Sequence, residues 1–367
     1  MSEIEVPSAV VEAFDFGGEV VDVAPLGQGR INGSFLISTR GGTRWPKYVL
    51  QRINTHVFVD PGALMDNIVA VTDYLKPGIA AEGGDPLRET LSVVKTRMGQ
   101  SWWRDDDGSP WRAYLFVDGM VCHQSASSPQ VFHDAGEAFG TFARRLDEFP
   151  VDVLHSTIAS FHDTRVRLAG FLVAVDRDRV RRVSTCPAEI DAVLARRDQC
   201  ARLMGLADAG QMPIRVTHND TKLNNVLMDP ADRRRACVID LDTVMPGLAV
   251  HDFGDAIRYG ANRTDEDDPD IDRVGLDRAM FEAFTIGWVR GFGPGLTPIE
   301  KANLVWGVRA MTLEQGMRFL TDYLDGDRYY GVAYPTQNLD RARNQFALLS
   351  DIESHLAQLE QIVADLV

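Results

Sequence analysis

The sequence predicts an α+β fold of two lobes, a small N-terminal lobe built on an antiparallel sheet and a larger, mainly helical C-terminal lobe. Three observations favour this fold. About five strand-like segments precede residue 118, amphipathic helical segments dominate beyond residue 128, and 367 residues suffice for two lobes with a substantial core. We expect the N-terminal lobe at 1–117, a hinge at 118–122 and the C-terminal lobe at 123–367.

Composition and charge narrow the classes of function. The chain is 45% hydrophobic and 25% charged, as is usual for a soluble globular enzyme. Its formal net charge of −15 argues against nucleic acid and anionic membrane surfaces, which require basic patches, and would suit a cationic substrate. The N-terminus lacks signal-peptide features, no apolar run could span a bilayer, and the cysteines show no CxxC spacing. We therefore expect a cytoplasmic protein with reduced thiols.

The first predicted elements are a short helix and two strands, at Ala9–Phe14, Val20–Leu26 and Phe35–Thr39. The segment between these strands reads GQGRINGS. Backbone N–H groups at Gly27 and Gly29 could approach phosphates, because no Cβ intervenes. Asn32 stands where the dinucleotide fingerprint requires its third glycine, and a strand follows instead of a helix. The segment therefore fits either a phosphate-binding loop or a plain hairpin turn.

The third predicted strand is Tyr48–Ile53, in which alternation places Val49 and Gln51 on one face and Arg52 on the other. The remaining elements of this lobe are a helix at Ala63–Leu75 and strands at Leu91–Arg97 and Trp111–Val117, the last preceded by a turn at Asp106–Gly108. Phe116–Cys122 then leaves the sheet, and we interpret it as the hinge.

Helices dominate the rest of the chain. Ser128 and Pro129 cap a helix with an apolar face, and the acidic run Asp265–Asp272 is interpreted as an exposed loop. Further helices are predicted near Thr164–Val175, Pro187–Gly205, Leu276–Arg290, Pro298–Leu324 and Asp340–Leu366, with another that begins at Asp252.

The segment from Val216 to Asp255 carries the chemistry. Two predicted strands, Val226–Met228 and Ala236–Ile239, flank a turn at Asp229–Arg235. Before them stands the spacing H-x-D-x-x-x-x-N, formed by His218, Asp220 and Asn225, and Asp240 ends the second strand. Phosphoryl transfer needs this set: one carboxylate takes a hydroxyl proton, and another, with an amide oxygen, holds Mg²⁺ against phosphates. Any one of them alone would read as a loop cap or turn residue.

In these four residues the sequence resembles the aminoglycoside phosphotransferase and choline kinase superfamily, whose fold is protein-kinase-like. The resemblance implies that Asp220 is the catalytic base, that Lys222 contacts the transferred phosphate, and that Asn225 and Asp240 bind Mg²⁺. ATP would lie in the cleft between the lobes. The resemblance also implies that Asp255 steadies the catalytic loop.

Protein kinases carry on the third strand a lysine for the ATP phosphates, held by an acid on the next helix. Here Gln51 occupies the aligned position, with Arg52 one residue later, and Asp66 is the candidate acid or an ordinary helix-start aspartate. The expected nucleotide-contacting residues are therefore Gly27, Gly29, Asn32, Val49, Gln51, Arg52 and Asp66.

Two further segments, Gln51–Phe58 and Leu313–Tyr330, resemble the N-acetylhexosamine 1-kinase branch of the superfamily. This implies transfer of the ATP γ-phosphoryl group to the anomeric hydroxyl of N-acetylglucosamine or N-acetylgalactosamine. Asp220, Arg318 and Tyr329 would contact the sugar, although Arg318 could equally form a structural ion pair between helices. The alternatives are a kinase for another sugar, an aminoglycoside or choline, and a pseudokinase-like binding module, which the departure at Gln51 favours.

Overall fold

The chain folds into two units, the first built on an antiparallel sheet and the second on helices. The structure is a computed structural model that describes residues 6–27, 32–41, 46–233 and 235–366. The first unit comprises Met1–Val121, Glu148–Ala159 and Leu227–Met245, and the second comprises Cys122–Asp147, Ser160–Val226 and Pro246–Val367. An N-terminal sheet followed by a larger helical part confirms the predicted fold class.

Two short segments that lie beyond residue 122 in the sequence, 148–159 and 227–245, belong to the first unit. Asn67, on the first long helix, holds one residue of each. Its side-chain nitrogen donates to the carbonyl of His155 at 2.8 Å and to the carbonyl of Val244 at 3.0 Å. Contacts between residues so distant in sequence cannot be read from local patterns.

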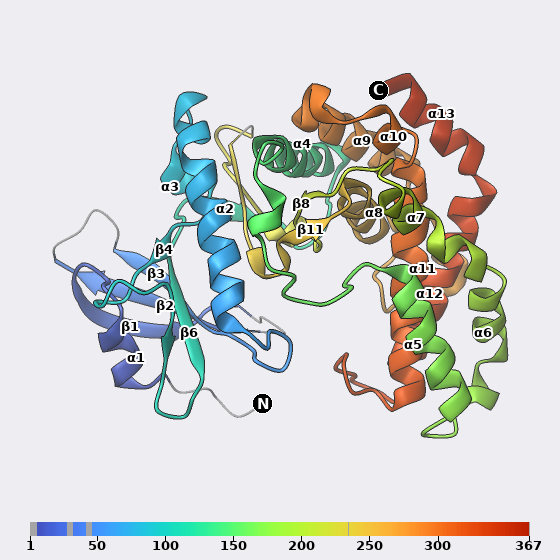
Figure 1. Cartoon of the computed structure of the whole chain (residues 1–367), viewed down its shortest axis with the longest axis horizontal. Helices are drawn as coiled ribbons and strands as arrows, with labels where there is room; N and C mark the ends of the chain where they lie inside the picture. Colours follow the sequence, from blue (N-terminus) through green and yellow to red (C-terminus); the bar gives the residue numbers. More distant parts are fainter. Residues whose placement is uncertain (1–5, 28–31, 42–45, 234, 367) are drawn as a thin grey trace. The chain divides into compact units, whose positions relative to one another are not determined.

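The sheet of the first unit has the strand order β1-β2-β3-β6-β4, and β5 also pairs with β6 (Figure 1). Its strands are β1 (Glu19–Pro25), β2 (Gly33–Arg40), β3 (Lys47–Arg52), β4 (Val93–Val94), β5 (Trp103–Arg104) and β6 (Pro110–Leu115). β4 is shorter than the predicted Leu91–Arg97, because Thr96 enters a turn in which its N–H donates to the carbonyl of Gln100 at 2.8 Å.

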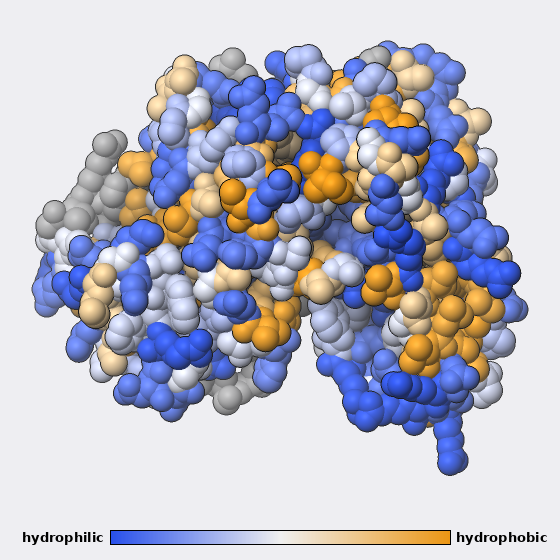
Figure 2. All heavy atoms as spheres, in the orientation of Figure 1, coloured by the Kyte–Doolittle hydropathy of each residue, from blue (hydrophilic) through white to orange (hydrophobic). Residues whose placement is uncertain are grey.

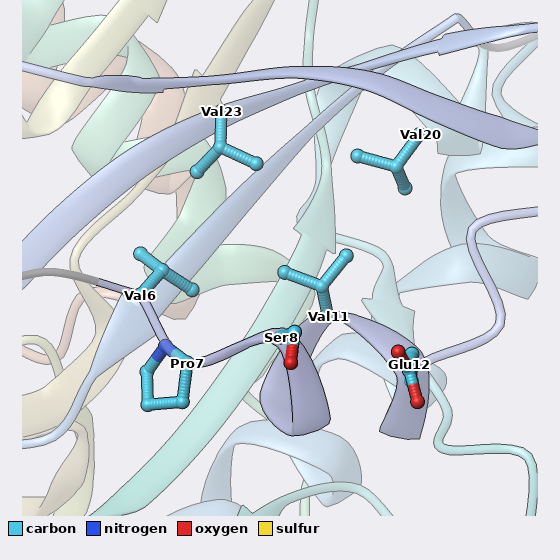
Figure 3. Close-up of a pocket in the computed structure, with 7 residues that line it drawn as sticks. All are labelled: Val6, Pro7, Ser8, Val11, Glu12, Val20 and Val23. Carbon is cyan, nitrogen blue, oxygen red and sulfur yellow. The ribbon is translucent and has the colours of Figure 1, made fainter.

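One face of this sheet packs against α1 (Ser8–Ala13), where Val10 and Phe14 meet Ile37, Leu50 and Trp111. Val49 and Gln51 lie on the opposite face, since Leu50 between them points into this core, as strand alternation predicts. Figure 3 shows a surface pocket on this unit, lined by residues of α1, β1 and the preceding segment, namely Val6, Pro7, Ser8, Val11, Glu12, Val20 and Val23.

Helix α2 (Pro61–Ala81) starts earlier and ends later than predicted, and α3 (Pro86–Glu89) follows it. The Asp60 side chain accepts the N–H groups of Gly62 and Ala63, and Pro61 stands at the first helical position, so the helix begins there. Four apolar residues of this helix with helical spacing are buried, namely Leu64, Ile68, Val71 and Leu75.

The remaining strands are short. β7 (Val121–Cys122), β9 (Val226–Met228) and β10 (Ala236–Val238) form a sheet of order β10-β9-β7, and β8 (Arg215–Thr217) pairs with β11 (Met245–Gly247). β9 and β10 are the two strands that were predicted on either side of the turn at Asp229–Arg235.

The second unit contains the helices α4 (Pro129–Arg145), α5 (Thr164–Arg177), α6 (Pro187–Leu194), α7 (Arg202–Asp208), α8 (Ala249–Gly260), α9 (Arg278–Phe292), α10 (Pro298–Lys301), α11 (Leu304–Asp325), α12 (Gln337–Ser354) and α13 (Leu356–Leu366). Two helix pairs approach closely at glycines. Gly254 on α8 lies against the Gly307 backbone on α11, and Gly136 on α4 lies against the backbone of α9, where a Cβ would clash. These crossings fix α8 relative to α11, and α4 relative to α9, within the unit.

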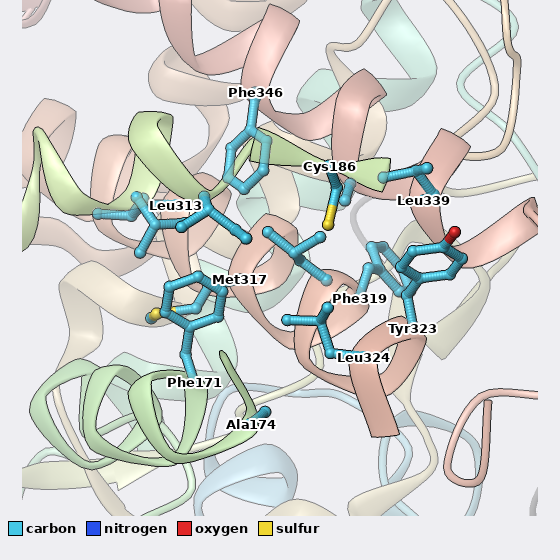
Figure 4. Close-up of a cluster of buried hydrophobic side chains, with 14 of the residues drawn as sticks. Phe171, Ala174, Cys186, Leu313, Met317, Phe319, Tyr323, Leu324, Leu339 and Phe346 are labelled. Carbon is cyan, nitrogen blue, oxygen red and sulfur yellow. The ribbon is translucent and has the colours of Figure 1, made fainter. Parts of the chain in front are cut away.

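A buried apolar cluster joins α5, α6, α11 and α12 (Figure 4). Figure 4 shows Phe171, Leu313, Met317 and Phe319 among its members. On α11 the side chains of Leu313, Phe319, Leu320 and Tyr323 are all buried. The cluster therefore fixes the rotation of α11, on which Glu314 and Arg318 stand between core positions.

Three of the long predicted helices are interrupted, at Arg196, Asn303 and His355. Each of these residues has a φ between −117° and −112°, outside the helical region. The side-chain nitrogen of Asn303 also donates to the carbonyl of Ile299 at 2.8 Å, and this bond competes with the hydrogen bond that the same carbonyl would accept within a helix. The helix propensities of the residues do not reveal such competition between side-chain and backbone hydrogen bonds.

The face of the molecule seen in Figure 2 is largely hydrophilic, with scattered apolar side chains. Three exposed apolar residues, Val166, Leu172 and Val173, belong to α5. Within the described ranges, no helix combines the length and the apolar character that crossing a bilayer requires.

Candidate active site

The loop after β8 brings Asp220, Lys222 and Asn225 together in the second unit. Lys222 Nζ lies 2.8 Å from Asp220 Oδ1. A single 3₁₀ turn, Leu223–Asn225, returns the chain so that Asn225 Nδ2 donates to Asp220 Oδ2 at 3.2 Å and to its carbonyl at 2.8 Å. Lys222, a predicted catalytic residue, and Asn225, a predicted metal ligand, therefore both contact the carboxylate of Asp220, which remains partly exposed.

Asp220 and Lys222 each stabilise the ionised form of the other. Burial acts to raise the pKa of Asp220, but the Lys222 ammonium and the hydrogen bond from Asn225 outweigh it and lower the pKa. Burial acts to lower the pKa of Lys222, while the Asp220 carboxylate raises it overall. At neutral pH the cluster is thus an ionised pair.

The catalytic loop is held by Asp252 in the first turn of α8. Its carboxylate accepts the N–H of His218 at 2.8 Å and that of Asn219 at 2.7 Å, and its carbonyl accepts the Thr221 hydroxyl at 2.5 Å. Asn219 has a φ of 62°, a left-handed conformation that a non-glycine residue holds only with outside support. His218 is buried, and its Nδ1 accepts the N–H of Asp220 at 3.3 Å. Its role here is therefore structural.

The supporting aspartate differs from the one expected. Sequence analysis gave this role to Asp255, which instead pairs with Arg258 at 2.7 Å. Because α8 begins at Ala249 rather than at Asp252, it is Asp252 that lies in the first turn, beside the loop. Burial raises the pKa of Asp252 to about 6, against the hydrogen bonds from the loop.

A second support was not found from the sequence. His162 Nε2 lies 3.0 Å from the Asn219 carbonyl, and its Nδ1 lies 2.8 Å from Glu314 Oε1 on α11. Burial acts to lower the pKa of His162, but Glu314 raises it overall, so a protonated ring donates to both partners. Thr164 donates to the other oxygen of Glu314 at 3.0 Å. The available signal was an acid, Glu314, among the apolar positions Leu313 and Met317 of α11.

Asp240 lies in the first unit, whereas Asp220 and Asn225 lie in the second. Asp240 follows β10 at an exposed position with a φ of 58°. The next acid, Asp242, is buried and binds Asn32: Asn32 Nδ2 donates to Asp242 Oδ2 at 2.7 Å. Two aspartates of one short turn therefore have different surroundings, one exposed and one buried.

The expected nucleotide-contacting residues are distributed over the first unit. Gly27 forms a turn after β1 with a φ of 68°, and Gly29 lies outside the described residues. Gln51 is partly buried, while Arg52 is exposed at the end of β3. Gln51 therefore shares the sheet face with Val49, and Arg52 does not.

Helix α2 turns Asp66 outward. Its side chain is 74% exposed and lies 3.8 Å from His155. The buried cation of this sheet is Arg112, and its acidic partner is Asp242 at 2.5 Å rather than Asp66.

Arg318 is enclosed by aromatic rings. Its guanidinium carbon lies 5.3 Å from the ring centroid of Phe161, 5.7 Å from that of Tyr330 and 5.9 Å from that of Tyr329. Its Nη1 donates to Gln315 Oε1 at 3.2 Å, and within the described parts of the chain it forms no salt bridge. The expected structural ion pair is therefore not how Arg318 is held.

Tyr329 is positioned through its backbone. The Asp322 carboxylate accepts the N–H groups of Arg328, Tyr329 and Tyr330, each at 2.8 Å, just beyond the end of α11. The ring of Tyr329 remains 58% exposed, edge-on to that of Tyr330. Arg318 and Tyr329, the two residues predicted to contact the sugar together with Asp220, therefore lie next to each other.

A sequence profile described as the phosphotransferase enzyme family matches residues 22–292. The chain belongs to this family. The match includes every predicted catalytic, metal-binding and nucleotide-contacting residue of this phosphotransferase, and it ends before Arg318 and Tyr329. It also confirms the resemblance to the aminoglycoside phosphotransferase and choline kinase superfamily.

Several solved structures of small-molecule phosphotransferases have a similar fold. An aminoglycoside phosphotransferase from Alicyclobacillus acidocaldarius aligns with 100% of this phosphotransferase and 98% of its own chain, at a TM-score of 0.60 and 16% identity. Spectinomycin phosphotransferase in complex with ADP and spectinomycin aligns over 97% and 100%, at a TM-score of 0.61 and 12% identity. Choline kinase from Cryptosporidium parvum aligns over 94% and 92%, at 0.57 and 12%. At these identities the likeness concerns the fold.

Proposed function

We propose that this phosphotransferase is an ATP- and Mg²⁺-dependent kinase that phosphorylates an N-acetylhexosamine at its anomeric hydroxyl. The observation that carries the proposal is the cluster of Asp220, Lys222 and Asn225 in a chain of the phosphotransferase enzyme family. The resemblance of Gln51–Phe58 and Leu313–Tyr330 to N-acetylhexosamine 1-kinases supports the choice of sugar.

In this proposal Asp220 orients the acceptor hydroxyl and takes its proton. Its lowered pKa keeps it ionised, so that it accepts the hydroxyl hydrogen bond before transfer begins. Lys222 lies 2.8 Å away and offsets charge on the transferred phosphoryl group. Asp252 and His162 keep the backbone on either side of Asn219 in place, so that the carboxylate does not have to be ordered when substrate binds.

Asn225 and Asp240 are the residues that would hold Mg²⁺. The donor set fits: Asn225 uses its side-chain nitrogen on Asp220, which leaves the amide oxygen as a ligand, and Asp240 offers a carboxylate on an exposed turn. Mg²⁺ prefers such oxygen ligands in small number, completed by phosphate oxygens. When bound, the ion neutralises charge on the nucleotide phosphates. The segment around Gly27 and the face of β3 with Val49 and Gln51 are the proposed nucleotide contacts.

The surroundings of Arg318 favour a neutral, hydroxyl-rich acceptor. A guanidinium held by rings and one amide oxygen, without a carboxylate, keeps donors for sugar hydroxyl and carbonyl oxygens. Tyr329 adds an exposed ring and a hydroxyl beside it. Because Arg318 forms no salt bridge among the described residues, its charge would also repel a cationic acceptor such as choline or an aminoglycoside.

The test is ADP release with MgATP and a panel of acceptors: N-acetylglucosamine, N-acetylgalactosamine, glucose, galactose, choline and kanamycin. We expect the two N-acetylhexosamines to give the highest kcat/KM, with a product whose phosphorus couples to the anomeric proton by NMR. Higher turnover of choline or kanamycin would overturn the sugar assignment. Binding of MgATP or sugar, seen by thermal shift without ADP release for any acceptor, would instead support the pseudokinase-like module that Gln51 favours.

A further inference from the structure

A row of polar side chains crosses the sheet of the first unit. Ser34 on β2 pairs in register with Gln51 on β3, and Gln51 pairs in register with Arg112 on β6. Gln51 joins its neighbours: its Nε2 donates to Ser34 Oγ at 3.0 Å, and its Oε1 accepts from Arg112 Nε at 3.0 Å. Paired residues of adjacent strands share a face, so the row is continuous and ends in a guanidinium.

The guanidinium of Arg112 forms an ion pair with Asp242. Arg112 Nη1 lies 2.5 Å from Asp242 Oδ1, and the two residues are 1% and 3% exposed. Asp242 Oδ2 accepts from Asn32, whose own Oδ1 accepts the N–H of Asn54 at 3.0 Å. Both carboxylate oxygens are therefore engaged, and the buried charge is compensated, as burial requires. Asp242 is unsuited to bind a metal in this state, although it stands two residues from Asp240.

The same turn is fixed at its backbone. The Thr157 hydroxyl donates to the Asp242 carbonyl at 3.4 Å, and Asn67 donates to the Val244 carbonyl at 3.0 Å. Asp240, at the head of the turn, is in the left-handed region, which is sustained only when surrounding contacts determine it. The ion pair of Asp242 with Arg112 differs from these contacts because both of its partners are charged and buried.

We propose that Arg112 is a positioning residue of the metal site: through Asp242 it holds the turn that presents Asp240. Arg112 thereby connects the sheet to the proposed metal ligand. It stands on β6, in register with Gln51 on β3, and Gln51 occupies the position at which protein kinases have a lysine. Compared with that arrangement, the positive charge stands on the neighbouring strand of the same sheet face. Its acidic partner is Asp242 in the turn, instead of an acid on the helix that follows β3. This inference rests on the proposed function, because it assumes that Asp240 binds Mg²⁺.

The test measures ATP binding by calorimetry, with and without Mg²⁺, in the parent protein and in Arg112→Gln. We expect Arg112→Gln to lose about tenfold or more in affinity for MgATP, because the loss of an interaction between charged groups is worth about that much. Its affinity for metal-free ATP should stay within about twofold of the parent. Arg112→Lys, which keeps the charge, should recover part of the loss and serves if the glutamine variant does not fold.

Arg309→Gln is the matched control. Arg309 is also a buried arginine, 2.7 Å from Glu353 in the second unit, so its loss should lower the melting temperature without changing the effect of Mg²⁺. If both variants only lose stability, Arg112 is framework and the proposal falls. An equal loss of metal-free ATP binding in Arg112→Gln would make Arg112 a phosphate contact and also overturn it. A parent protein without any Mg²⁺-dependent ATP binding would instead refute the proposed function.

Discussion

The carboxylate of Asp252 accepts the backbone N–H of Asn219 at 2.7 Å, one residue before Asp220. Asn219 is in the left-handed conformation, which costs about 1–2 kcal/mol for a residue with a Cβ. The hydrogen bond from outside the loop offsets that cost, and His162 adds a contact at the Asn219 carbonyl. The backbone next to Asp220 is therefore held by two side chains from outside its loop, those of Asp252 and His162.

Asp252→Ala should reduce kcat by at least an order of magnitude. Two backbone N–H groups of the loop would lose their acceptor, at a cost of about 1–3 kcal/mol for each buried donor left unsatisfied. Asp277→Ala is the control, since Asp277 caps α9 by accepting the Met280 N–H at 3.1 Å. That variant should lose about 1 kcal/mol of stability without a comparable change in kcat. Equal effects of both on turnover would make Asp252 an ordinary contributor to stability.

Asp220→Asn should bind MgATP and sugar with nearly unchanged affinity and lose turnover by several orders of magnitude. The amide keeps the size and the contact with Asn225, but it cannot take the acceptor proton. Lys222 would lose its 2.8 Å partner, so its stability contribution must be checked by melting temperature in the same preparation. Substantial turnover in a folded Asp220→Asn protein would remove Asp220 from the role of base.

Asp240→Ala should abolish the Mg²⁺-dependent part of nucleotide binding, because the main anionic ligand is lost. Asp240 is exposed, so the loss of stability should be limited to about 1 kcal/mol, the strain of alanine at a φ of 58°. The comparison is ATP affinity with and without Mg²⁺, measured alongside Asp229→Ala, an aspartate of the neighbouring turn paired with Arg88 at 3.2 Å. Asp229→Ala should keep the full effect of the ion. Identical Mg²⁺ dependence in the parent and in Asp240→Ala would make Asp240 a turn residue only.

The parts that sequence predicted correctly are those in which cause and effect are close in the chain. Strand alternation placed Val49 and Gln51 on one face because a strand has a period of two. The cluster of Asp220, Lys222 and Asn225 lies within six residues, so a single turn assembles it.

The parts that sequence missed depend on long-range packing. Arg112 and Asp242 are 130 residues apart, and no local pattern pairs a cation in an apolar strand with the second acid of a distant turn. Asp252 replaced Asp255 because the start of α8 was predicted too late, and helix boundaries depend on contacts outside the helix.

Arg318→Ala should raise the sugar KM or lower kcat/KM by about tenfold, without weakening ATP binding. A hydrogen bond from a charged donor is worth about 1.5–3 kcal/mol and one between neutral groups about 0.5–1.5 kcal/mol, so Tyr329→Phe should do less damage. Tyr334→Phe is the control for loss of an exposed tyrosine hydroxyl, and it should have no effect. A destabilised Arg318→Ala with unchanged sugar KM would leave the rings around Arg318 as packing alone.

The His162–Glu314 pair predicts a pH dependence of stability. Burial opposes ionisation of Glu314, but His162 and its hydrogen bond lower the pKa to about 2 from an ordinary 4.5. A depressed carboxyl pKa gives stability that is complete above pH 4.5 and is lost as the pH falls toward 2, here about 3 kcal/mol. The raised pKa of His162 has the opposite sign: its contribution is complete below 6.5 and is lost as the pH rises through the raised value.

Urea unfolding at a series of pH values, in the parent and in Glu314→Gln, measures both limbs. The variant should lose the acid limb, so that the difference in unfolding free energy between the two proteins shrinks as the pH falls below 4.5. Glu360→Gln, at an exposed position of α13, is the control and should follow the parent throughout. Since His162 also binds the Asn219 carbonyl, kcat should fall in Glu314→Gln even where the protein is fully folded. A constant free-energy difference across the whole range would mean that Glu314 stabilises α11 by packing and not by its charge.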